Sequence, residues 1–480
     1  MLSSDFSSKN AKYIKWKDDW DAISDVKEGE RTIKFQGTKY VPILGGQTPT
    51  DYVSYVERGV FYGATSRTIS GLSGTILRKT PRIDIVGRED LLKPFFKSAT
   101  IDGRSIYEVI EDVIENLLSY GRYGILVDMS DTELPYFSLY KAVDIYNWQT
   151  EVINGEKKLI ALRLHETVDD SENNNTIDVI REYFLDEDGF VVVREYHDGT
   201  MPGDIETTWI NKGEYFPSVK GKRLNYIPFV CIGSINNLID DVNKPPILDL
   251  ANLNLAHWRV TVDYYHGLHF CALPTIYAIG FDPKGTEFLV GPGHVIKNRN
   301  TEAKVGMLEF TGQGLRAVEK ALESLENQMA VMGSRLLETQ KKAAEAFETV
   351  KMRSMGDSAT LSSVVDNAEN GIAKAIEYAQ NWMLMEGDVK VKLNKDFNPS
   401  QIDPLMVQAL FQTYQGGGIS LPTFLYNLKS GEVLPEDTTI EAEIERINEE
   451  VTKRNATQDI EKTNTNIENS NIDEIDTEKV

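Results

Sequence analysis

Three histidines are the residues best placed for metal chemistry. His257, His266 and His269 fall in one long apolar segment, and the last two are three residues apart, so a helix would bring both rings to one face. No Cys, Asp or Glu has a matching spacing that would complete a ligand set. We therefore expect these rings to pack in a core or an interface rather than to bind a metal ion.

Two acidic motifs also lack the residues that their chemistry needs. Asp186-Glu187-Asp188-Gly189 begins like a calcium loop, but the later oxygen ligands and the closing glutamate are missing. A hairpin turn is expected there. His165-Glu166 lacks the second histidine of a zinc protease motif and falls in a predicted strand. The sequence predicts no metal and no cofactor.

The motifs of nucleotide and nucleophile chemistry are absent from the sequence. There is no GxxxxGK[ST] phosphate loop, no GxSxG nucleophile turn and no GxGxxG after a strand. Six histidines among 480 residues leave little for acid–base catalysis. We predict that the chain is not an enzyme.

The most basic local cluster of the central region consists of Lys341, Lys342, Lys351 and Arg353. Such a cluster could contact phosphate groups. The neighbouring Glu345 and Glu348 allow a second reading, in which the cluster is the solvated, self-compensating face of a helix.

Two long helices with a short insert between them would position most of these residues. The first begins at Pro245-Pro246 and runs to Phe270, with apolar residues around most of its circumference. The second follows the break at Gly312 to Gly314 and places an apolar residue at alternating intervals of three and four, which predicts a packing seam. The seam consists of Leu315, Val318, Leu322, Leu325, Met329, Met332 and Leu336.

The insert, Cys271 to Thr311, has the composition of a small β-containing unit. It contains β-branched and aromatic runs separated by Gly, Pro and Asn. Since each helix would be about 35 Å long at 1.5 Å per residue, the insert would form a tip away from the rest of the chain. A helix, a tip and a returning helix make a stalk.

The remaining segments predict an α+β body followed by short helices. Ser105–Ser119 is an amphipathic helix, and GRYGILVDM, FSLYKAVDIYNW and KKLIALRLHETV read as strands before a hairpin that turns at Asp188-Gly189. A long helix from Ser358 and a strand within Asp388–Phe397 follow. Further helices are expected at Gln401–Tyr414, Leu421–Leu428 and Ile440–Val451, and the acidic residues beyond Asn455 predict a disordered tail.

This order of segments resembles the portal proteins of tailed bacteriophages, in the branch catalogued as a domain of unknown function. The resemblance covers Tyr40 to Gly418. Outside the stalk, it rests on Tyr40-Val41-Pro42, Gly71-Leu72-Ser73-Gly74, Lys79-Thr80-Pro81 and Glu348–Leu361.

The resemblance implies the portal fold, with an α/β wing, a two-helix stem, a small clip and a helical crown. The implied parts are an N-terminal arm and wing at 1–244, stem helices at 245–270 and 313–338, a clip at 271–312, a tunnel loop, wing helix and returning strand at 339–400, a crown at 401–455 and an acidic tail at 456–480.

The resemblance also implies a function. The chain would form a homo-oligomeric ring, a dodecamer by family analogy, at the capsid portal vertex of the virion after assembly in the host cytoplasm. Double-stranded DNA would pass through the ring without sequence specificity during packaging and ejection. The wing would contact the major capsid protein, and the clip would dock the terminase large subunit and then a head-tail adaptor. By resemblance, the basic cluster faces DNA and the seam packs neighbouring stems.

The charge of the chain agrees with a conduit better than with a DNA-gripping protein. A net charge of −23 and a pI near 4.8 do not favour phosphate binding, whereas an acidic channel lining would keep DNA from sticking. No apolar run reaches the length of a membrane span, and the two cysteines, Cys231 and Cys271, form no disulfide framework.

Two other classes of protein remain open at this point. One is a hydrolase or nuclease in which the helices brace a catalytic domain, and such a protein would be a monomer with an essential carboxylate. The other is a non-portal structural adaptor that pairs through the seam as a dimeric coiled coil. The mass of the particle separates the three.

Overall fold

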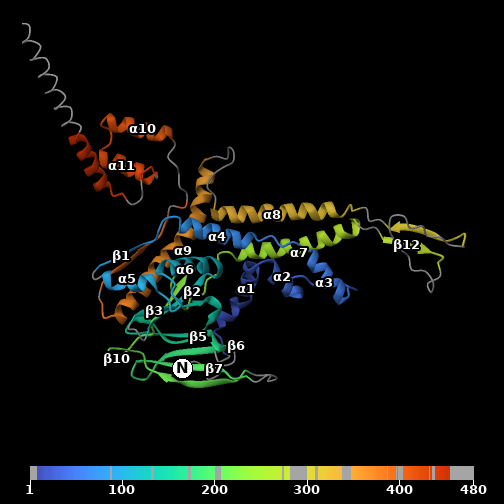
Figure 1. Ribbon diagram of the computed structural model, residues 1–480, viewed down its shortest axis with the longest axis horizontal. Helices are drawn as coiled ribbons and strands as arrows, with labels where there is room; N and C mark the ends of the chain where they lie inside the picture. Colours follow the sequence, from blue (N-terminus) through green and yellow to red (C-terminus); the bar gives the residue numbers. More distant parts are fainter. Residues whose placement is uncertain are drawn as a thin grey trace, which may run out of the picture. The chain divides into compact units, whose positions relative to one another are not determined.

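The computed structural model describes residues 8–86, 89–130, 134–170, 175–200, 207–272, 275–281, 300–308, 312–337, 347–385, 387–395, 397, 404–431, 433–434 and 438–453. The chain divides into two compact units, Met1–Phe397 and Asn398–Val480. The first unit holds the strands and the long helices, and the second holds short helices (Figure 1). The predicted α+β class is confirmed.

The core of the first unit is built around a three-stranded antiparallel sheet in the order β11-β2-β3. Its strands are β2 (Arg122–Met129), β3 (Pro135–Lys141) and β11 (Phe229–Gly233). The first six residues of β2 are all buried, and all five of β11. Such continuous burial explains why β11, a short apolar run without alternation, was not predicted as a strand.

Helix α6 (Ile106–Tyr120) packs on β2, and its sequence specifies both of its ends. The Ser105 side chain accepts a hydrogen bond from the Glu108 backbone, while the Glu108 carboxylate accepts one from Ser105 in return. Gly121 ends the helix at φ 71°, a conformation that glycine adopts at low cost. The helix predicted for Ser105–Ser119 is confirmed.

Helix α9 (Phe347–Trp382) also packs on this sheet and is longer than predicted. A Cβ at Gly371 would lie 2.6 Å from Ile232 Cγ1, so the glycine lets the helix approach β11 closely. The predicted start at Ser358 is wrong, because α9 begins at Phe347 and continues through Gly356. One glycine inside a helix costs only about 1 kcal/mol, which is too little to end it.

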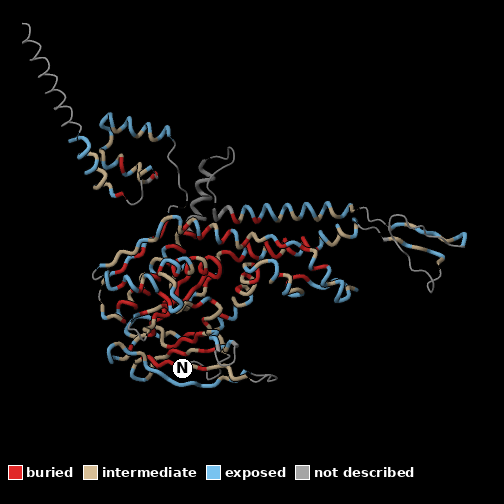
Figure 2. The backbone as a smooth tube through the Cα atoms, in the orientation of Figure 1, coloured by how far each residue is buried: buried red, intermediate tan, exposed pale blue. Residues whose placement is uncertain are grey.

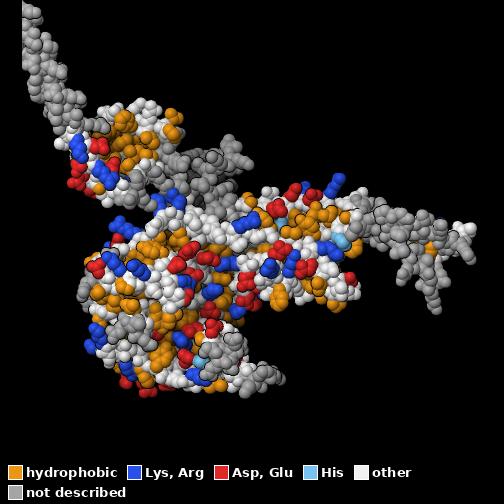
Figure 3. Space-filling model, viewed as in Figure 1, with side chains coloured by type: hydrophobic (Ala, Val, Ile, Leu, Met, Phe, Trp, Pro, Cys, Tyr) orange, Lys and Arg blue, Asp and Glu red, His pale blue; other side chains and the backbone are white. Residues whose placement is uncertain are grey.

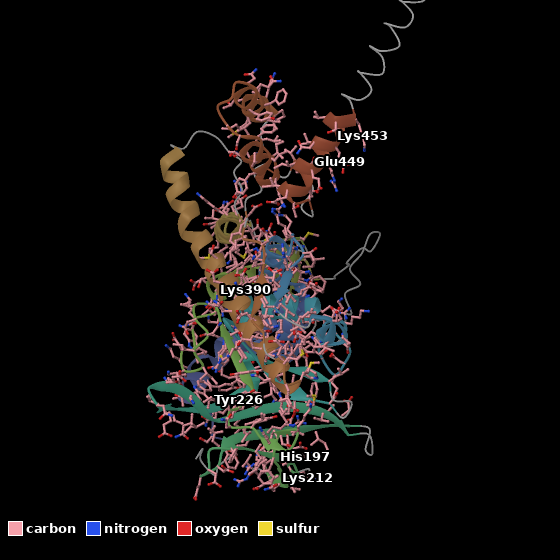
Figure 4. All side chains as sticks on the ribbon, turned by 90° about the vertical axis from the view of Figure 1, so that its left-hand side faces the viewer. His197, Lys212, Tyr226, Lys390, Glu449 and Lys453 are labelled. Carbon is pink, nitrogen blue, oxygen red and sulfur yellow. The ribbon has the colours of Figure 1, made fainter. Side chains whose placement is uncertain are left out.

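A second, five-stranded antiparallel sheet has the order β4-β5-β6-β7-β8. The strands are β4 (Ile145–Ile153), β5 (Glu156–Asp170), β6 (Asn175–Leu185), β7 (Val191–Asp198), which carries His197, and β8 (Trp209–Tyr215), which carries Lys212 (Figure 4). The segment FSLYKAVDIYNW is not one strand as predicted but two, β3 and β4, because a 3₁₀ turn at Ala142–Asp144 separates them.

The hairpin between β6 and β7 turns where the sequence predicts it. The carboxylate of Asp186 accepts hydrogen bonds from the backbone amides of Asp188 at 3.1 Å and Phe190 at 2.8 Å, and Gly189 has φ 81°. This carboxylate also pairs with Arg223 at 2.7 Å. The acidic motif is therefore a turn. His165-Glu166 lies on strand β5, as predicted.

The N-terminal segment is part of the core. Helix α1 (Ala11–Glu28) buries Tyr13, Trp20, Ile23 and Val26, and the Trp20 indole donates to the Tyr120 carbonyl at 3.1 Å. The following elements are α2 (Glu30–Gln36), a 3₁₀ turn at Gly37–Lys39, α3 (Pro49–Arg58), α4 (Ala64–Ile76), β1 (Arg82–Ile85) and α5 (Glu89–Lys97).

The first unit also contains two short strand pairs, one between distant segments and one between adjacent segments. β1 pairs with β14 (Val389–Lys392), which is the predicted strand that returns to the body after α9. β9 (Ser218–Val219) pairs with β10 (Lys222–Arg223) across a turn at Lys220-Gly221.

Helices α7 (Leu248–Ala272) and α8 (Leu315–Leu337) lie side by side, as predicted (Figure 1). Between them in the chain, β12 (Thr275–Ile279) and β13 (Lys304–Leu308) form an antiparallel pair. α7 begins at Leu248 rather than at Pro245. Pro245 is followed by a second proline, and a residue that precedes proline is disfavoured from helical backbone angles. Among the described residues, no helix is long and apolar enough to cross a membrane.

The second unit contains α10 (Pro404–Gln415), α11 (Leu421–Ser430) and helical residues 440–453. The three helices predicted for this region are confirmed. The predicted acidic tail, 456–480, lies outside the described residues.

Candidate assembly surface on the paired helices

Burial along α7 changes at its middle. The buried residues of this helix all lie between Leu248 and Val262. Beyond that point Tyr265, Leu268 and Phe270 are 37%, 41% and 45% exposed, although all three are large and apolar. Figure 2 follows the same change from red to pale colours along the helix. The second half of α7 therefore extends past the core.

Helix α3 packs directly against α7, from Trp258 to His269. A Cβ at Gly59, the residue after α3, would lie 2.6 Å from both the Trp258 ring and Val262 Cγ2. Only a residue without a side chain fits this contact as it stands.

One side chain of α7 caps the neighbouring helix α4. Asn254 is fully buried, and its carbonyl oxygen accepts from the Thr65 amide at 3.1 Å and the Thr65 hydroxyl at 3.0 Å. Its amide group donates to the Tyr62 carbonyl at 2.7 Å. Gly63, at the N-cap of α4, has no side chain that could make this bond, so Asn254 supplies the cap from another helix.

The predicted seam on α8 faces the same chain. Met329 is 2% exposed, and Leu315, Val318, Leu322, Leu325 and Met332 are half-buried. A Cβ at Gly267 of α7 would lie 2.7 Å from Leu315 Cδ2, so the two helices meet closely at this end of the seam. The side chain of Leu336 lies outside the described residues. Packing of the seam between copies stays a prediction.

The side of α8 that faces away from the seam is polar and open, and Met332 lies at the edge of both. A shallow groove of about 510 Å³ follows it. The residues along the groove are Lys320, Glu323, Ser324, Asn327, Gln328, Val331 and Met332. Val331 is 46% exposed and is therefore an apolar side chain outside the seam. This side has both charge signs and hydrogen-bonding groups, as the polar rim of a protein interface does.

The exposed apolar residues of α7 were not predicted as a surface. The sequence does contain a sign of it, because apolar residues surround most of α7, whereas α8 and the body can cover only some of its sides. Tyr265, Leu268 and Phe270 are apolar residues on the sides that are not fully covered. Together with the groove on α8, they form the candidate assembly surface.

The histidines of α7 contact aromatic rings and an arginine. The His266 ring packs edge-on against Tyr55 and Phe270, with centroids 4.8 Å apart in both pairs. Arg58 Nη1 lies 3.5 Å from His266 Nδ1, and Nη2 lies 3.3 Å from His269 Nε2. Burial, the Arg58 charge and His269 all lower the pKa of His266, so its neutral form is favoured.

The third histidine, His257, is buried, and its Nε2 lies 3.4 Å from the Glu326 carboxylate of α8. Its ring is 6.0 Å from that of Tyr62. The histidines thus pack against aromatic rings and polar partners, the arrangement that we preferred to a metal site. Among the residues that the structure describes, no three metal-ligating side chains gather.

The basic cluster is only partly within the described residues. Lys341 and Lys342 lie outside them, and Lys351 and Arg353 belong to the first turns of α9, so these two are in a helix. Their contact with DNA stays a prediction.

The helix pair and α9 lie in a segment that matches a known protein family. Residues 246–383, from α7 to α9, match a family described as a domain of unknown function (DUF4055). No curated protein matches the chain. The solved structures to which the chain is similar include a chain from the neck of an empty GTA particle, with 12% identity, a TM-score of 0.37 and coverage of 78% of this chain and 91% of that one.

A second similar chain comes from the virion of a native gene transfer agent particle. It has 13% identity and a TM-score of 0.35, and the match covers 81% of this chain and 95% of the other. Similarity at this level does not assign a function.

Proposed function

We propose that the chain is a phage-type portal protein, which forms a ring at one vertex of a capsid and lets double-stranded DNA pass through the centre. The observation that carries the proposal is the helix pair. α7 and α8 run together past the core of an α+β body, and a small β hairpin lies between them in the chain. In the proposal, the body would be the wing, the helix pair the stem and the hairpin the clip.

In a ring, the exposed sides of α7 and α8 would contact neighbouring copies. Tyr265, Leu268 and Phe270 of α7 are apolar and 37–45% exposed in one chain, and the groove on α8 shares only Met332 with the described seam. If α7 of one copy lies along α8 of the next, two different surfaces meet. Such a heterologous contact forms a ring when the rotation between neighbouring copies closes on itself. The subunit number, twelve by family analogy, is part of the proposal.

The same geometry disfavours a dimeric coiled coil. A coiled coil between two chains would use the seam of α8, but Met329 is buried and the other described seam residues are half-buried within one chain. Pairing through the seam would have to displace α7 from α8. A neighbouring copy could contact the exposed sides of α7 and α8 without separating the two helices.

The partners follow from the proposed parts. The wing would contact the major capsid protein, and the hairpin of β12 and β13 would dock the terminase large subunit and later a head-tail adaptor. DNA would pass through a channel of a chain with net charge −23, which limits counterion release and therefore adhesion. The action of the protein is then mechanical and electrostatic rather than catalytic.

Electron microscopy of the purified full chain tests the proposal directly. Negatively stained particles should be rings with a central hole, and mass photometry should give a multiple of the 54.1 kDa chain near twelve. A monomer would return the chain to the hydrolase or nuclease alternative, and a dimer to the structural adaptor. Either result would overturn the proposal.

A further inference from the structure

An arginine and two histidines meet where the C-terminal end of α3 lies against the second half of α7. Arg58 is the last residue of α3, and its Nη1 and Nη2 atoms lie 3.5 Å from His266 Nδ1 and 3.3 Å from His269 Nε2. All three side chains are half-buried. Figure 3 shows histidine atoms, in pale blue, among hydrophobic side chains on the surface of the paired helices. These three residues define the arginine–histidine contact.

The guanidinium group of Arg58 determines the protonation state that both rings must have. A guanidinium group only donates hydrogen bonds, so each ring nitrogen that faces it must be an acceptor. An imidazole ring accepts a hydrogen bond only when it is neutral, since both nitrogens of the charged ring carry a hydrogen atom. The contact therefore requires neutral rings, with the hydrogen on Nε2 of His266 and on Nδ1 of His269.

No carboxylate offsets the charge of Arg58. Among the residues that the structure describes, no Asp or Glu side chain forms an ion pair with it, and its Nη1 also donates to the Ser54 carbonyl at 2.9 Å. α8, which packs against this part of α7 as well, meets it through the apolar Leu315 at Gly267. A proton on either ring would place a second positive charge beside Arg58 and remove the acceptor of its hydrogen bond.

Other titratable groups face His266 from both helices. They are Asp51 and Tyr55 of α3 and Asp263 of α7, and both carboxylates favour protonation of the ring. Each carboxylate already accepts a hydrogen bond, Asp263 from the Tyr55 hydroxyl and Asp51 from the N-cap of α3. Burial and the other two residues of the arginine–histidine contact outweigh them and lower the pKa of His266. The folded chain thus favours the neutral ring.

We propose that the arginine–histidine contact is pH-sensitive, holding the end of α3 on α7 while both rings are neutral and opening when His266 takes up a proton. The contact is closed above pH 6.5 and opens as the pH falls through the lower, folded pKa of His266. Because the Phe270 ring packs on His266, with centroids 4.8 Å apart, the same proton affects the candidate assembly surface. The inference concerns a single chain and does not depend on the proposed ring.

Amide hydrogen exchange of the full chain, read by mass spectrometry, tests the inference. Exchange of residues 49–58 is measured at pH 7.5 and at pH 5.5, above the pI of 4.8, and each rate is divided by the intrinsic rate of an unfolded peptide at that pH. The normalised rate should be about tenfold higher at pH 5.5, because a hydrogen bond to a charged group is lost. Equal normalised rates at the two pH values would contradict the inference.

A double variant keeps the two acceptors but removes the protonation. The side-chain oxygen of Asn can replace Nδ1 of His266, that of Gln can replace Nε2 of His269, and neither amide titrates in this range. In His266→Asn with His269→Gln, exchange of residues 49–58 should therefore stay slow at both pH values. His197→Gln, a change on β7, is the control and should keep the wild-type response. A double variant that keeps the response, or a control that loses it, would overturn the inference.

A second measurement decides the case of a double variant that exchanges fast at both pH values, since the loss of ring packing would by itself loosen α3. Exchange of the imidazole C2 hydrogens gives the pKa of His266 in the wild type and in Arg58→Gln. Removing the cation should raise this pKa, and an unchanged value would refute the inference. None of these results depends on whether the particles have a central hole, so the portal proposal stands or fails separately.

Discussion

Asn254 joins α7 to α4 through the hydrogen bonds of its side chain. Its side chain makes three hydrogen bonds, to the Thr65 amide, the Thr65 hydroxyl and the Tyr62 carbonyl, at a fully buried position. Asn254→Ala would leave these groups without partners, and we expect the free energy of unfolding to fall by about 2 kcal/mol. Urea denaturation measures this. Asn327→Ala, the same change at an exposed position of α8, should have little effect; equal losses would contradict the capping role.

Two histidines should give the stability of the chain opposite dependences on pH. His165 Nδ1 lies 3.5 Å from Asp144 and Nε2 lies 3.3 Å from Asp178, with the ring stacked on Tyr146. Burial opposes protonation, but the hydrogen bond to Asp144 and the charge of Asp178 outweigh it and raise the pKa above 6.5. This stabilisation is complete below pH 6.5 and is lost as the pH rises through the higher, folded value.

For His266 the sign is reversed. Its folded pKa lies below 6.5, so the unfolded chain binds the proton more readily, and stability falls as the pH drops below 6.5. Melting temperatures between pH 5 and pH 8 should therefore show His165→Gln flattening the alkaline side of the profile and His266→Gln flattening the acidic side. Profiles that change on the same side in both variants would refute the two assignments.

The packing of α3 on α7 depends on one glycine. In Gly59→Ala, the new Cβ would lie 2.6 Å from the Trp258 ring and from Val262, so α3 or α7 must shift. We expect a loss of about 1–3 kcal/mol in the free energy of unfolding, as for other overpacked cores.

Gly74→Ala provides the matched control for this contact. Gly74 lies inside α4, and nothing lies within 4 Å of its added Cβ, so the same substitution should stabilise the chain by roughly 0.5–1 kcal/mol. Differential scanning calorimetry of the two variants should thus give melting temperatures on opposite sides of the wild type. A neutral Gly59→Ala would mean that α3 is loosely held.

Elements with a clear period could be predicted from the sequence, whereas their partners could not. The amphipathic α6 and the seam of α8 follow from spacings of three and four, and both helices are found within two residues of the predicted bounds. That the seam faces α7 depends on tertiary contacts such as Gly267 with Leu315. The local sequence pattern does not specify against which surface the apolar side of a helix will pack.

The same limit explains the residues that sequence reasoning missed. Tyr265 and Leu268 have the same composition signal as the buried Trp258 and Val262 of their helix, and only the end of the body separates the two sets. The pairing of β1 with β14 joins residues about three hundred positions apart and leaves no local trace. Turn chemistry, in contrast, is local, which is why the hairpin at Asp188-Gly189 could be predicted.

The acidity of the whole chain should govern how readily copies associate. Each chain has a net charge of −23, so neighbouring copies in a ring repel each other. This repulsion reaches about 30 Å at an ionic strength of 0.01 M, but only about 8 Å at physiological salt, where screening is stronger. We expect the fraction of chains in rings, counted by mass photometry, to rise with salt over this range. A fraction that falls with salt would mean that charge pairs, rather than apolar contacts, hold the copies together.

In the proposed ring, DNA would pass through a channel that attracts its phosphate groups at few sites. The basic cluster is the candidate for such a site. Replacing Lys341, Lys342, Lys351 and Arg353 by Ala should leave ring formation unchanged but reduce the DNA packaged or retained, because phosphate contacts are removed.

The control for the basic cluster removes the same charge elsewhere. Lys158, Lys212, Lys222 and Lys390 are exposed lysines of the first unit, and their replacement by Ala also lowers the charge of each chain by four. Nuclease protection of DNA in assembled particles compares the two variants. If net charge alone governed passage, both variants would package DNA equally, and a role for the basic cluster would have to be abandoned. A deficit confined to the first variant requires local contact, since the total repulsion between channel and DNA is the same in both.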